Sequence, residues 1–544
     1  MLFTVITFLA VTIAVAVFAW WRTRDDDLST KDGYFLAGRS LTAPIIAGSL
    51  MLTNLSTEQI VGQPGQSYIS NMGCMAWDVT SCCGLIGLAL IFLPKYLKLG
   101  VTTVPEFLEE RFDSTTKRIV SVLFLIGYML SFLPTVLYSG ALAFNNIFHI
   151  DQIVGVSQLT AVIFIAVIIG VIGSIYAIFG GLKAVAVSDT ANGIGLIFGA
   201  CIVPVMAFIL LGNGSFVDGL HDFLTNLPGE RFNAINPANA TAPMIPWPVL
   251  FTGMMVNEFF YWGTHQAIIQ RALGAKNLAE AQKGAIYAGF LKLTNPFLIT
   301  MCGLIVLYFG QKGLLSADTV AALEQTSDLA YPTLVSMVLP KPVLGVFSAV
   351  LLGAVLSSFN SALNSCVTLY TLDIHRPLLN PNASDAHIVK VGKRFGTILA
   401  VVSIVVTPVV SLAPTGLYDF LQSCFGFYNV PILASVLIGM FSTRIPALAP
   451  KLGLILHVIL YSISKFIPAL NGVHYLYVLA VLFVFNVALQ LFIGKIRPLE
   501  TPFEMRDVHA VDMTPWKHAK LASLICMALL IGIYMIFSPL VLAA

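Results

Sequence analysis

Long apolar stretches alternate with short polar segments along the whole chain. About fourteen of these stretches approach or exceed the roughly 20 residues that a helix needs to cross a bilayer. They lie at residues 2–21, 43–69, 73–95, 117–148, 156–178, 184–211, 247–271, 284–310, 332–374, 391–412, 416–441, 447–467, 472–493 and 519–541. The beginning of the ninth stretch, near residues 331–343, is also compatible with an external hairpin. The pattern predicts an all-α polytopic membrane protein with about 14 transmembrane helices.

The second apolar stretch is interrupted by a polar run, NLSTEQ at residues 54–59. Lipid cannot satisfy free backbone polar groups, so a helix broken at this depth must lie against protein or line a water-filled cavity. Many secondary transporters build their ion and substrate sites from such broken helices. The interruption therefore predicts a broken helix and favours a transporter.

Composition narrows the function classes. Of 544 residues, 57% are hydrophobic and 10% are charged, whereas soluble domains carry about 25% charged residues. The net charge of +2 and the lack of a basic tail give no indication of nucleic-acid binding. None of the eight cysteines forms a C-x-x-C pair, and no catalytic or metal-ligand motif is present, so the chain is not expected to be an enzyme. Without an ATPase motif, uphill transport would use an ion gradient.

Lysine and arginine positions predict the orientation. With the N-terminus outside, about 24 of these residues fall on the inner side and about 4 outside, as the positive-inside rule requires. The stretch at 2–21 is expected to be a retained span, because it lacks a basic leading region and a convincing cleavage site. We therefore expect a multi-pass protein of the cell (inner) membrane with both termini outside. Nothing in the sequence indicates an oligomeric state.

The ninth stretch carries a polar face. Positions 357, 361, 364, 368 and 371 follow helical spacing, and each holds Ser, Thr or Asn. Hydroxyl oxygens suit a hard cation such as Na⁺, although Ser and Thr also mediate close packing of membrane helices. For Ser357 and Ser358 the broken helix offers a second source of oxygen ligands, which favours ion binding. For Asn364, Thr368 and Thr371 packing is the favoured interpretation.

Ionisable residues inside spans are costly, which makes them candidates for function. Asp78 follows Trp77 and precedes Ser81, a combination that can accept sugar hydroxyls beside an aromatic face. The alternative is an ion pair between Asp78 and Lys292, and the two roles are compatible. Asp189 near an inner end either attracts a cation or pairs with Lys183, and these alternatives stay open.

The seventh stretch combines a carboxylate with aromatic residues. Glu258, Trp262 and His265 share one side of a helix, and Tyr261 lies beside them. An aromatic stripe is usually core packing, but a carboxylate among aromatics within a span favours a wet cavity. His265 alone is expected to be structural. In the eleventh stretch Tyr418 and Gln422 are one turn apart, compatible with a hydrogen-bonding wall.

Several short motifs occur in a fixed order along the chain: GYFLAGRSL at 33–41, NLSTEQ at 54–59, YWG at 261–263 with QR at 270–271, AQKG at 281–284, and SS at 357–358 with LNS at 363–365. Together they resemble the sodium/solute symporter family, and more narrowly its sodium/glucose and bacterial sodium/galactose cotransporter branch. The resemblance covers nearly the whole chain. It implies an inverted five-helix repeat with a LeuT-like core and a broken first core helix. The expected units are an extra N-terminal helix at 1–22, repeats at 43–211 and 247–441, and three C-terminal helices at 447–541.

The resemblance also implies binding residues. Sodium would contact the backbone carbonyls of Leu52, Leu55 and Ala354 and the hydroxyls of Ser357 and Ser358, and Asp189 would lie on the sodium exit path. At least one Na⁺ is expected, and Ser361 leaves the stoichiometry open.

For the sugar, the resemblance retains Gln59, Ser81, Lys292 and Gln422, with Tyr261 closing beneath the sugar on the cytoplasmic side. Trp262 is placed with this set from the aromatic pattern. Asp78 stands where the galactose transporter has Glu. Glu258 stands where it has Asn, which adds a negative charge unless Glu258 is protonated or, as we hypothesise, offset by Lys292. Gln63, Trp77 and Tyr418 also differ, so galactose itself is in doubt.

The sequence thus predicts a sodium-coupled secondary active symporter that imports a neutral, hexose-like sugar or polyol by alternating access. The expected partners are Na⁺, the small solute and the lipid bilayer. Two alternatives remain: a sodium-coupled symporter of a non-sugar solute, and a non-transporting sugar sensor or sodium-leak channel.

Overall fold

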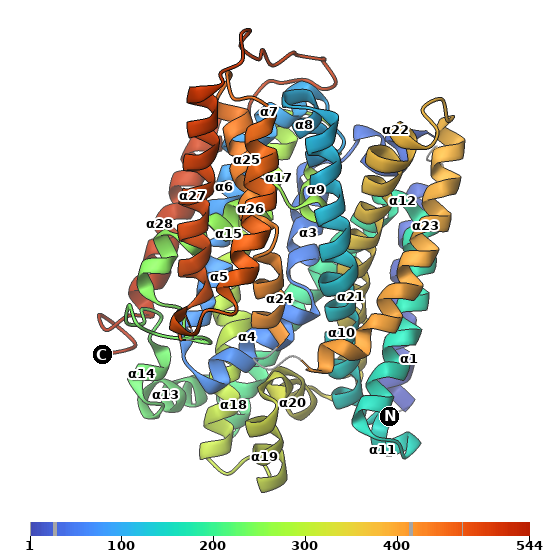
Figure 1. Ribbon diagram of the computed structural model, residues 1–544. Helices are drawn as coiled ribbons and strands as arrows, with labels where there is room; N and C mark the ends of the chain where they lie inside the picture. Colours follow the sequence, from blue (N-terminus) through green and yellow to red (C-terminus); the bar gives the residue numbers. More distant parts are fainter. Residues whose placement is uncertain (1, 25–29, 413–416, 471) are drawn as a thin grey trace.

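The computed structural model describes residues 2–24, 30–412, 417–470 and 472–544, and within these ranges the chain is helical apart from isolated β-bridges. The helices form an upright bundle (Figure 1). Both chain ends lie near the end of the bundle that carries α13 (Phe216–Asn226) and α19 (Ala317–Gln325). At the opposite end lie α7 (Leu93–Leu99) and α8 (Val104–Arg111).

The first half of the chain contains a broken helix followed by long helical segments. Its remaining elements are α1 (Leu2–Thr23), α2 (Lys31–Leu36), α3 (Ala43–Asn54), α4 (Thr57–Ile69), α5 (Ala76–Val79), α6 (Ser81–Gly87), α9 (Ser114–Gly127), α10 (Leu133–Phe148), α11 (Ile150–Val154), α12 (Gln158–Leu211) and α14 (Gly229–Phe232). Element α12 contains two apolar stretches that are long enough to span a membrane, Gln158–Ile175 and Leu182–Leu211.

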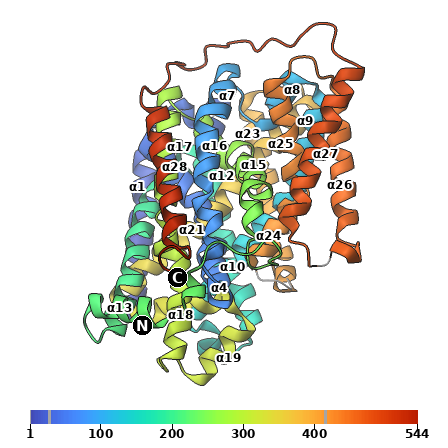
Figure 2. The ribbon, with the colours of Figure 1, turned by 90° about the vertical axis from the view of Figure 1, so that its left-hand side faces the viewer.

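The second half begins with another broken helix. Its elements are α15 (Gly253–Gly263), α16 (Gln266–Leu273), α17 (Leu278–Lys292), α18 (Met301–Gln311), α20 (Ala330–Val338), α21 (Lys341–Thr368), α22 (Arg376–Leu378), α23 (Asp385–Val406), α24 (Leu417–Phe425), α25 (Asn429–Phe441), α26 (Leu448–Ser464), α27 (Tyr475–Ile496) and α28 (Ala519–Ile536). In Figure 2, α26 and α27 flank the bundle on one side and α1 lies on the other.

The predicted membrane helices are recovered only in part. Among the described residues, ten helical segments are long and apolar enough to cross a membrane, and three shorter apolar helices add to them, α3, α25 and α26. The count differs from about fourteen because α3 and α4, α15 and α16, and α24 and α25 divide three predicted spans into short helices, and because α26, in a fourth, has only 17 residues. The start of the ninth stretch forms α20, which is separate from α21. The exact number of spans and the inverted repeat stay predictions.

The break expected at residues 54–59 lies at Leu55 and Ser56. Ser56 has an extended backbone with ψ of 179°, and its N–H donates to Asn54 O at 2.8 Å rather than to Leu52 O. The Gln59 N–H donates to Ser56 O at 3.0 Å rather than to Leu55 O. The carbonyls of Leu52 and Leu55 are thereby released from helical bonding, as at any helix terminus.

A second break separates α15 from α16. His265 has an extended backbone (φ −70°, ψ 113°), and the N–H groups of Thr264 and His265 both donate to Phe260 O. This break falls in the seventh predicted span, whereas the first falls in the second. The two broken helices thus occupy corresponding positions in the two predicted five-span units.

Close helix packing positions the interior side chains. Helix α3 packs against α12, α17 and α21, and α15 packs against α6 and α25. At Gly84 in α6, a Cβ atom would lie 2.6 Å from Glu258 O and 2.6 Å from Trp262 Cδ1. Only glycine allows α6 and α15 to approach this closely, and the approach brings Ser81 next to Glu258.

Candidate functional site

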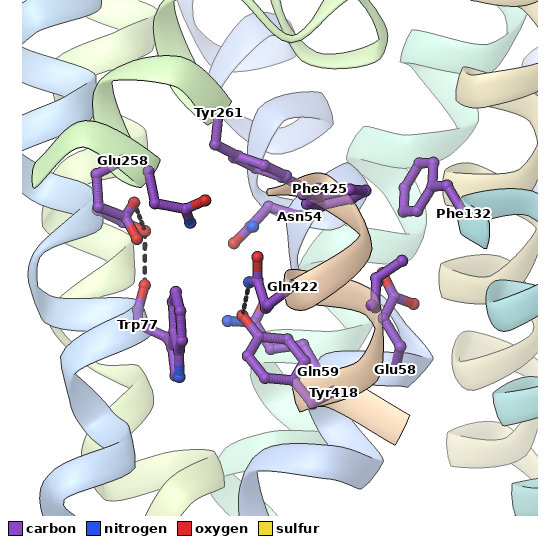
Figure 3. Close-up of a pocket in the computed structure, with 13 residues that line it drawn as sticks. Asn54, Glu58, Gln59, Trp77, Phe132, Glu258, Tyr261, Tyr418, Gln422 and Phe425 are labelled. Atoms are coloured by element: carbon purple, nitrogen blue, oxygen red, sulfur yellow. Dashed lines mark hydrogen bonds between the residues drawn. The ribbon is translucent and has the colours of Figure 1, made fainter. Parts of the chain in front are cut away.

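A polar cavity lies between the two broken helices, inside the bundle. The empty space in this region, with the open space at its mouth included, is about 370 Å³. Side chains from α3, α4, α5, α6, α10, α15 and α24 or their ends surround it (Figure 3): Asn54, Glu58, Gln59, Trp77, Ser81, Phe132, Asn257, Glu258, Tyr261, Tyr418, Leu421, Gln422 and Phe425. Both broken helices therefore contribute residues to one buried, hydrogen-bonding space.

Two carboxylates line this cavity. Glu258 accepts hydrogen bonds from Ser81 Oγ at 2.9 Å and from Trp262 Nε1 at 3.1 Å. Glu58 is 4% exposed, and its Oε2 atom has no hydrogen-bond partner. No lysine, arginine or histidine is among the described residues that line the cavity. The space thus offers acceptor oxygens and no cationic group.

Asp78 and Lys292 form a fully buried ion pair, with no measurable exposure of either side chain. Asp78 Oδ1 also accepts hydrogen bonds from Gln59 Nε2 and Asn295 Nδ2, both at 2.8 Å. Lys292 further donates to Gln59 Oε1 at 3.4 Å. Gln59 lines the cavity and therefore lies between the cavity and the Asp78–Lys292 pair.

Aromatic side chains lie at the two ends of the cavity (Figure 3). At one end, Trp77 and Tyr418 meet edge to face with ring centroids 5.6 Å apart. At the other end lies Tyr261, whose ring stacks on that of His265 with centroids 5.1 Å apart. The ring centroids of Tyr261 and Phe425 are 6.5 Å apart. Such rings exclude water and present flat apolar faces to a solute.

The helix break in α3–α4 faces the hydroxyl groups of α21. Ser358 Oγ donates to Thr53 O at 3.0 Å, and Thr53 Oγ1 lies 3.5 Å from Ser357 Oγ. Thr53 lies between Leu52 and Leu55, whose carbonyls are released by the break. The structure thus brings the predicted sodium-binding serines to the predicted carbonyl segment. Ala354 precedes Ser358 by one turn of α21.

Asp189 lies near this region, on α12. Its Oδ2 atom accepts a hydrogen bond from Ser49 Oγ at 2.8 Å and lies 3.8 Å from Arg271 Nη2. Asp189 is 1% exposed and Arg271 is fully buried. The carboxylate is therefore joined to α3 and α16.

The structure brings together most, but not all, of the residues predicted to contact a sugar. Five line the cavity: Gln59, Ser81, Glu258, Tyr261 and Gln422. Trp262 lies behind Glu258, and Asp78 and Lys292 lie behind Gln59. The Asp78–Lys292 ion pair, which the sequence offered as an alternative, is present. The direct contacts differ from this hypothesis, because the Lys292 ammonium pairs with Asp78 and Glu258 is held by Ser81 and Trp262. That the charge of Lys292 offsets Glu258 without direct contact stays a prediction.

Sequence reasoning missed several contributing residues. Asn257 and Phe132 line the cavity, and Asn295 donates a hydrogen bond to Asp78. Asn295 could have been noticed, since a polar residue three positions after Lys292 shares its helix face. No sequence signal pointed to Phe132, because one phenylalanine in an apolar span is unremarkable.

Comparison with known proteins identifies relatives. Residues 34–456 match the Sodium:solute symporter family. An uncharacterized symporter of Escherichia coli strain K12, YidK, is 46% identical over 97% of this chain and 90% of its own length. A sodium/glucose cotransporter of Vibrio parahaemolyticus is 31% identical over 85% of this chain and 84% of its own length.

The fold is also similar to that of a solved structure. A Na⁺-coupled sialic acid symporter, determined in a substrate-bound outward-open state, aligns with a TM-score of 0.77. The alignment covers 92% of this chain and 99% of that one, at 18% identity. The family match spans well over half of the sequence, and the sodium/glucose cotransporter branch suggested by the sequence motifs is represented among the relatives. The chain belongs to the sodium:solute symporter family.

Proposed function

We propose that this protein is a Na⁺-coupled secondary active symporter that imports a neutral, hexose-like sugar or polyol by alternating access. The observation that carries the proposal is the buried polar cavity between two broken helices, next to a helix break that faces α21 hydroxyls. Family membership supports Na⁺ coupling. The sugar or polyol is our inference from the chemistry of the cavity.

The lining of the cavity suits a solute with many hydroxyl groups. Among the residues that line the cavity, the acceptor atoms Asn54 Oδ1, Glu58 Oε2 and Gln422 Oε1 have no hydrogen-bond partner, and neither does the donor Trp77 Nε1. A hydroxyl both donates and accepts, so a polyol can satisfy donors and acceptors at once. The rings of Trp77 and Tyr418 add flat apolar surface for the C–H face of a sugar ring.

Sodium is a transported solute here, and its proposed ligands are oxygens. The carbonyls of Leu52, Leu55 and Ala354 and the hydroxyls of Ser357 and Ser358 would hold it, with Asp189 on its exit path. Hydroxyl and carbonyl oxygens are suitable ligands for a hard cation. Helix α4 carries Gln59 into the sugar cavity directly after the break. Sodium at the break would therefore order the wall of the cavity.

Alternating access would involve the two aromatic ends. Tyr261 lies at the end of α15 beside the second break, so movement of α15 relative to α16 would uncover the cavity on that side. We assign this side to the cytoplasm and place the protein in the inner membrane with both termini outside. The concentration of Lys and Arg at the end of the bundle with α7 and α8 supports this orientation.

The charge of the cavity makes a testable prediction about substrates. Glucose and glucuronate share a ring and differ in the carboxylate at carbon 6. Because no lysine, arginine or histidine is among the described residues that line the cavity, nothing there offsets the desolvation of an anion, and we expect an anionic solute to bind at least about tenfold more weakly than its neutral counterpart, the factor that 1.4 kcal/mol corresponds to. The measurement is Na⁺-gradient-driven uptake of labelled hexoses and myo-inositol into proteoliposomes, with matched neutral and anionic competitors.

Glucose, galactose or myo-inositol is expected to compete, whereas glucuronate, galacturonate and sialic acid are expected to compete poorly. The neutral member of each pair serves as the control for ring geometry. Equal or stronger competition by the anionic members would contradict the proposed substrate class.

A further inference from the structure

A buried arginine occupies the region where sodium is proposed to leave its site. Arg271, on α16, has no exposed surface. Its Nη1 donates to Ala267 O at 2.6 Å, its Nε donates to Ser49 Oγ at 3.2 Å, and its Nη2 donates to Ser361 Oγ. Its Nη2 also lies 3.8 Å from Asp189 Oδ2. The guanidinium thus joins α16 to α3, α12 and α21.

These partners belong to the same hydrogen-bond network as the proposed sodium ligands. Ser361 donates to Ser357 O at 2.5 Å, and its hydroxyl lies 3.4 Å from Thr53 Oγ1. Thr53 Oγ1 lies 3.5 Å from Ser357 Oγ, and Thr53 O accepts from Ser358. Ser361 therefore links the guanidinium to the backbone of Ser357 and, through Thr53, to Ser358.

Two cations cannot use these oxygens equally well at the same time. At a separation of about 6 Å and an effective dielectric constant near 20, two unit charges repel by an amount that corresponds to roughly a hundredfold in affinity. The negative charge of Asp189 partly offsets that of Arg271 and reduces this repulsion. A sodium ion that moves from Ser357 and Ser358 toward Asp189 approaches a carboxylate already associated with Arg271.

We propose that Arg271 is a tethered cation that competes with sodium for the Asp189–Ser361 oxygens and weakens sodium binding, so that the ion is released inside. The inference rests on the proposed sodium-coupled function. Arg271 acts as a positioning residue: it touches Ser361 and Asp189, which lie beside the proposed sodium ligands, and it does not line the sugar cavity.

The test measures sodium binding without transport. Purified full-length protein is titrated with NaCl at constant ionic strength, with choline as the replacement cation, and the unfolding temperature is followed. Binding of an ion to the native state alone stabilises that state by RT ln(1 + [Na⁺]/Kd), so a fit of the unfolding temperature against sodium concentration gives Kd, the half-maximal sodium concentration. We expect Arg271→Gln to lower the half-maximal sodium concentration about tenfold or more, and Arg271→Lys to stay within about threefold of the parent.

A matched control is Arg111→Gln. Arg111 is also buried, at 3% exposure, and donates to the backbone carbonyls of Gly439, Ser442 and Ile445. None of these carbonyls belongs to the proposed sodium site. This variant is expected to lower the unfolding temperature at every sodium concentration while leaving the half-maximal concentration unchanged. A structural role for Arg271 would give the same result as this control.

Removing Arg271 leaves Asp189 buried without its cation, which can prevent folding. The comparison is therefore repeated in the Asp189→Asn background, where no charge is orphaned by Arg271→Gln. Adding Arg271→Gln to Asp189→Asn is expected to lower the half-maximal sodium concentration about tenfold.

The outcomes are distinct. An unchanged or raised half-maximal sodium concentration in both backgrounds would overturn the role of Arg271 and leave sodium coupling intact. A parent protein that responds identically to Na⁺ and choline would instead contradict the proposed function itself, and the inference with it.

Discussion

Replacing Lys292 with methionine is expected to abolish Na⁺-dependent uptake and to lower the free energy of unfolding by about 3–5 kcal/mol. The reason is the buried carboxylate of Asp78, which would keep its hydrogen bonds from Gln59 and Asn295 but lose its cation. An uncompensated charge in the interior carries a large desolvation cost. Gln59 would also lose a contact, since Lys292 donates to it at 3.4 Å. Unfolding in detergent and uptake into proteoliposomes measure the two effects.

The matched control is Lys283→Met. Lys283 pairs with Glu280 at 2.9 Å, but the two side chains are 30% and 22% exposed. Exposed pairs contribute about 0–1 kcal/mol, so this variant should stay close to the parent in stability and uptake. The double variant Asp78→Asn/Lys292→Met should regain most of the lost stability, because it buries no unpaired charge. If Lys292→Met behaves like Lys283→Met, the buried pair does not organise the site.

The second large effect is expected at Ser358. Ser358→Ala removes a proposed sodium ligand and the hydrogen bond to Thr53 O at the helix break. We expect the sodium concentration for half-maximal uptake to rise at least about tenfold, the factor that 1.4 kcal/mol corresponds to. Sugar affinity at saturating sodium should change little, because Ser358 does not line the cavity. Uptake measured as a function of Na⁺ and of sugar separates the two parameters.

Ser403→Ala provides the control for loss of a buried hydroxyl. Ser403 is fully buried on α23 and donates to Leu399 O of its own helix at 2.8 Å. It is expected to leave the sodium dependence unchanged. Equal effects of the two substitutions, or a change in sugar affinity alone for Ser358→Ala, would contradict the sodium assignment.

The first helix break was predictable because its residues are polar within an apolar stretch. Asn54, Ser56 and Glu58 stand out against their neighbours, and the structure confirms a break there. The second break was hidden, since the aromatic run that ends at Trp262 continues the apolar pattern up to Gly263. Backbone geometry at Thr264 and His265, not composition, ends helix α15.

Pairings between distant residues were less predictable than the residues themselves. The sequence identified Asp78, Glu258 and Lys292 as buried charges but left two acids competing for one lysine. The close approach of α6 and α15 at Gly84 places Ser81 within hydrogen-bond distance of Glu258. Lys292, at the end of α17, instead pairs with Asp78. Such choices depend on how helices pack in three dimensions, which hydrophobic patterning alone does not specify.

The contacts of Arg271 were also not predictable from hydrophobic patterning. In the sequence this residue ends an apolar stretch and belongs to a family motif, which suggests an inner boundary. In the structure it is fully buried and joined to Ser49, Ser361 and Asp189. Its partners come from three helices that are far apart in sequence, so no local pattern could reveal them.

The most direct test of sodium-coupled sugar import is accumulation against a gradient. Proteoliposomes containing the full chain would be loaded with labelled hexose or inositol at the external concentration and then given an inward Na⁺ gradient. Our account predicts a transient internal concentration above the external one, which disappears when a sodium ionophore collapses the gradient. If the internal concentration of every solute in the panel stays equal to the external one, whether the gradient is of Na⁺, K⁺ or choline, our account is contradicted.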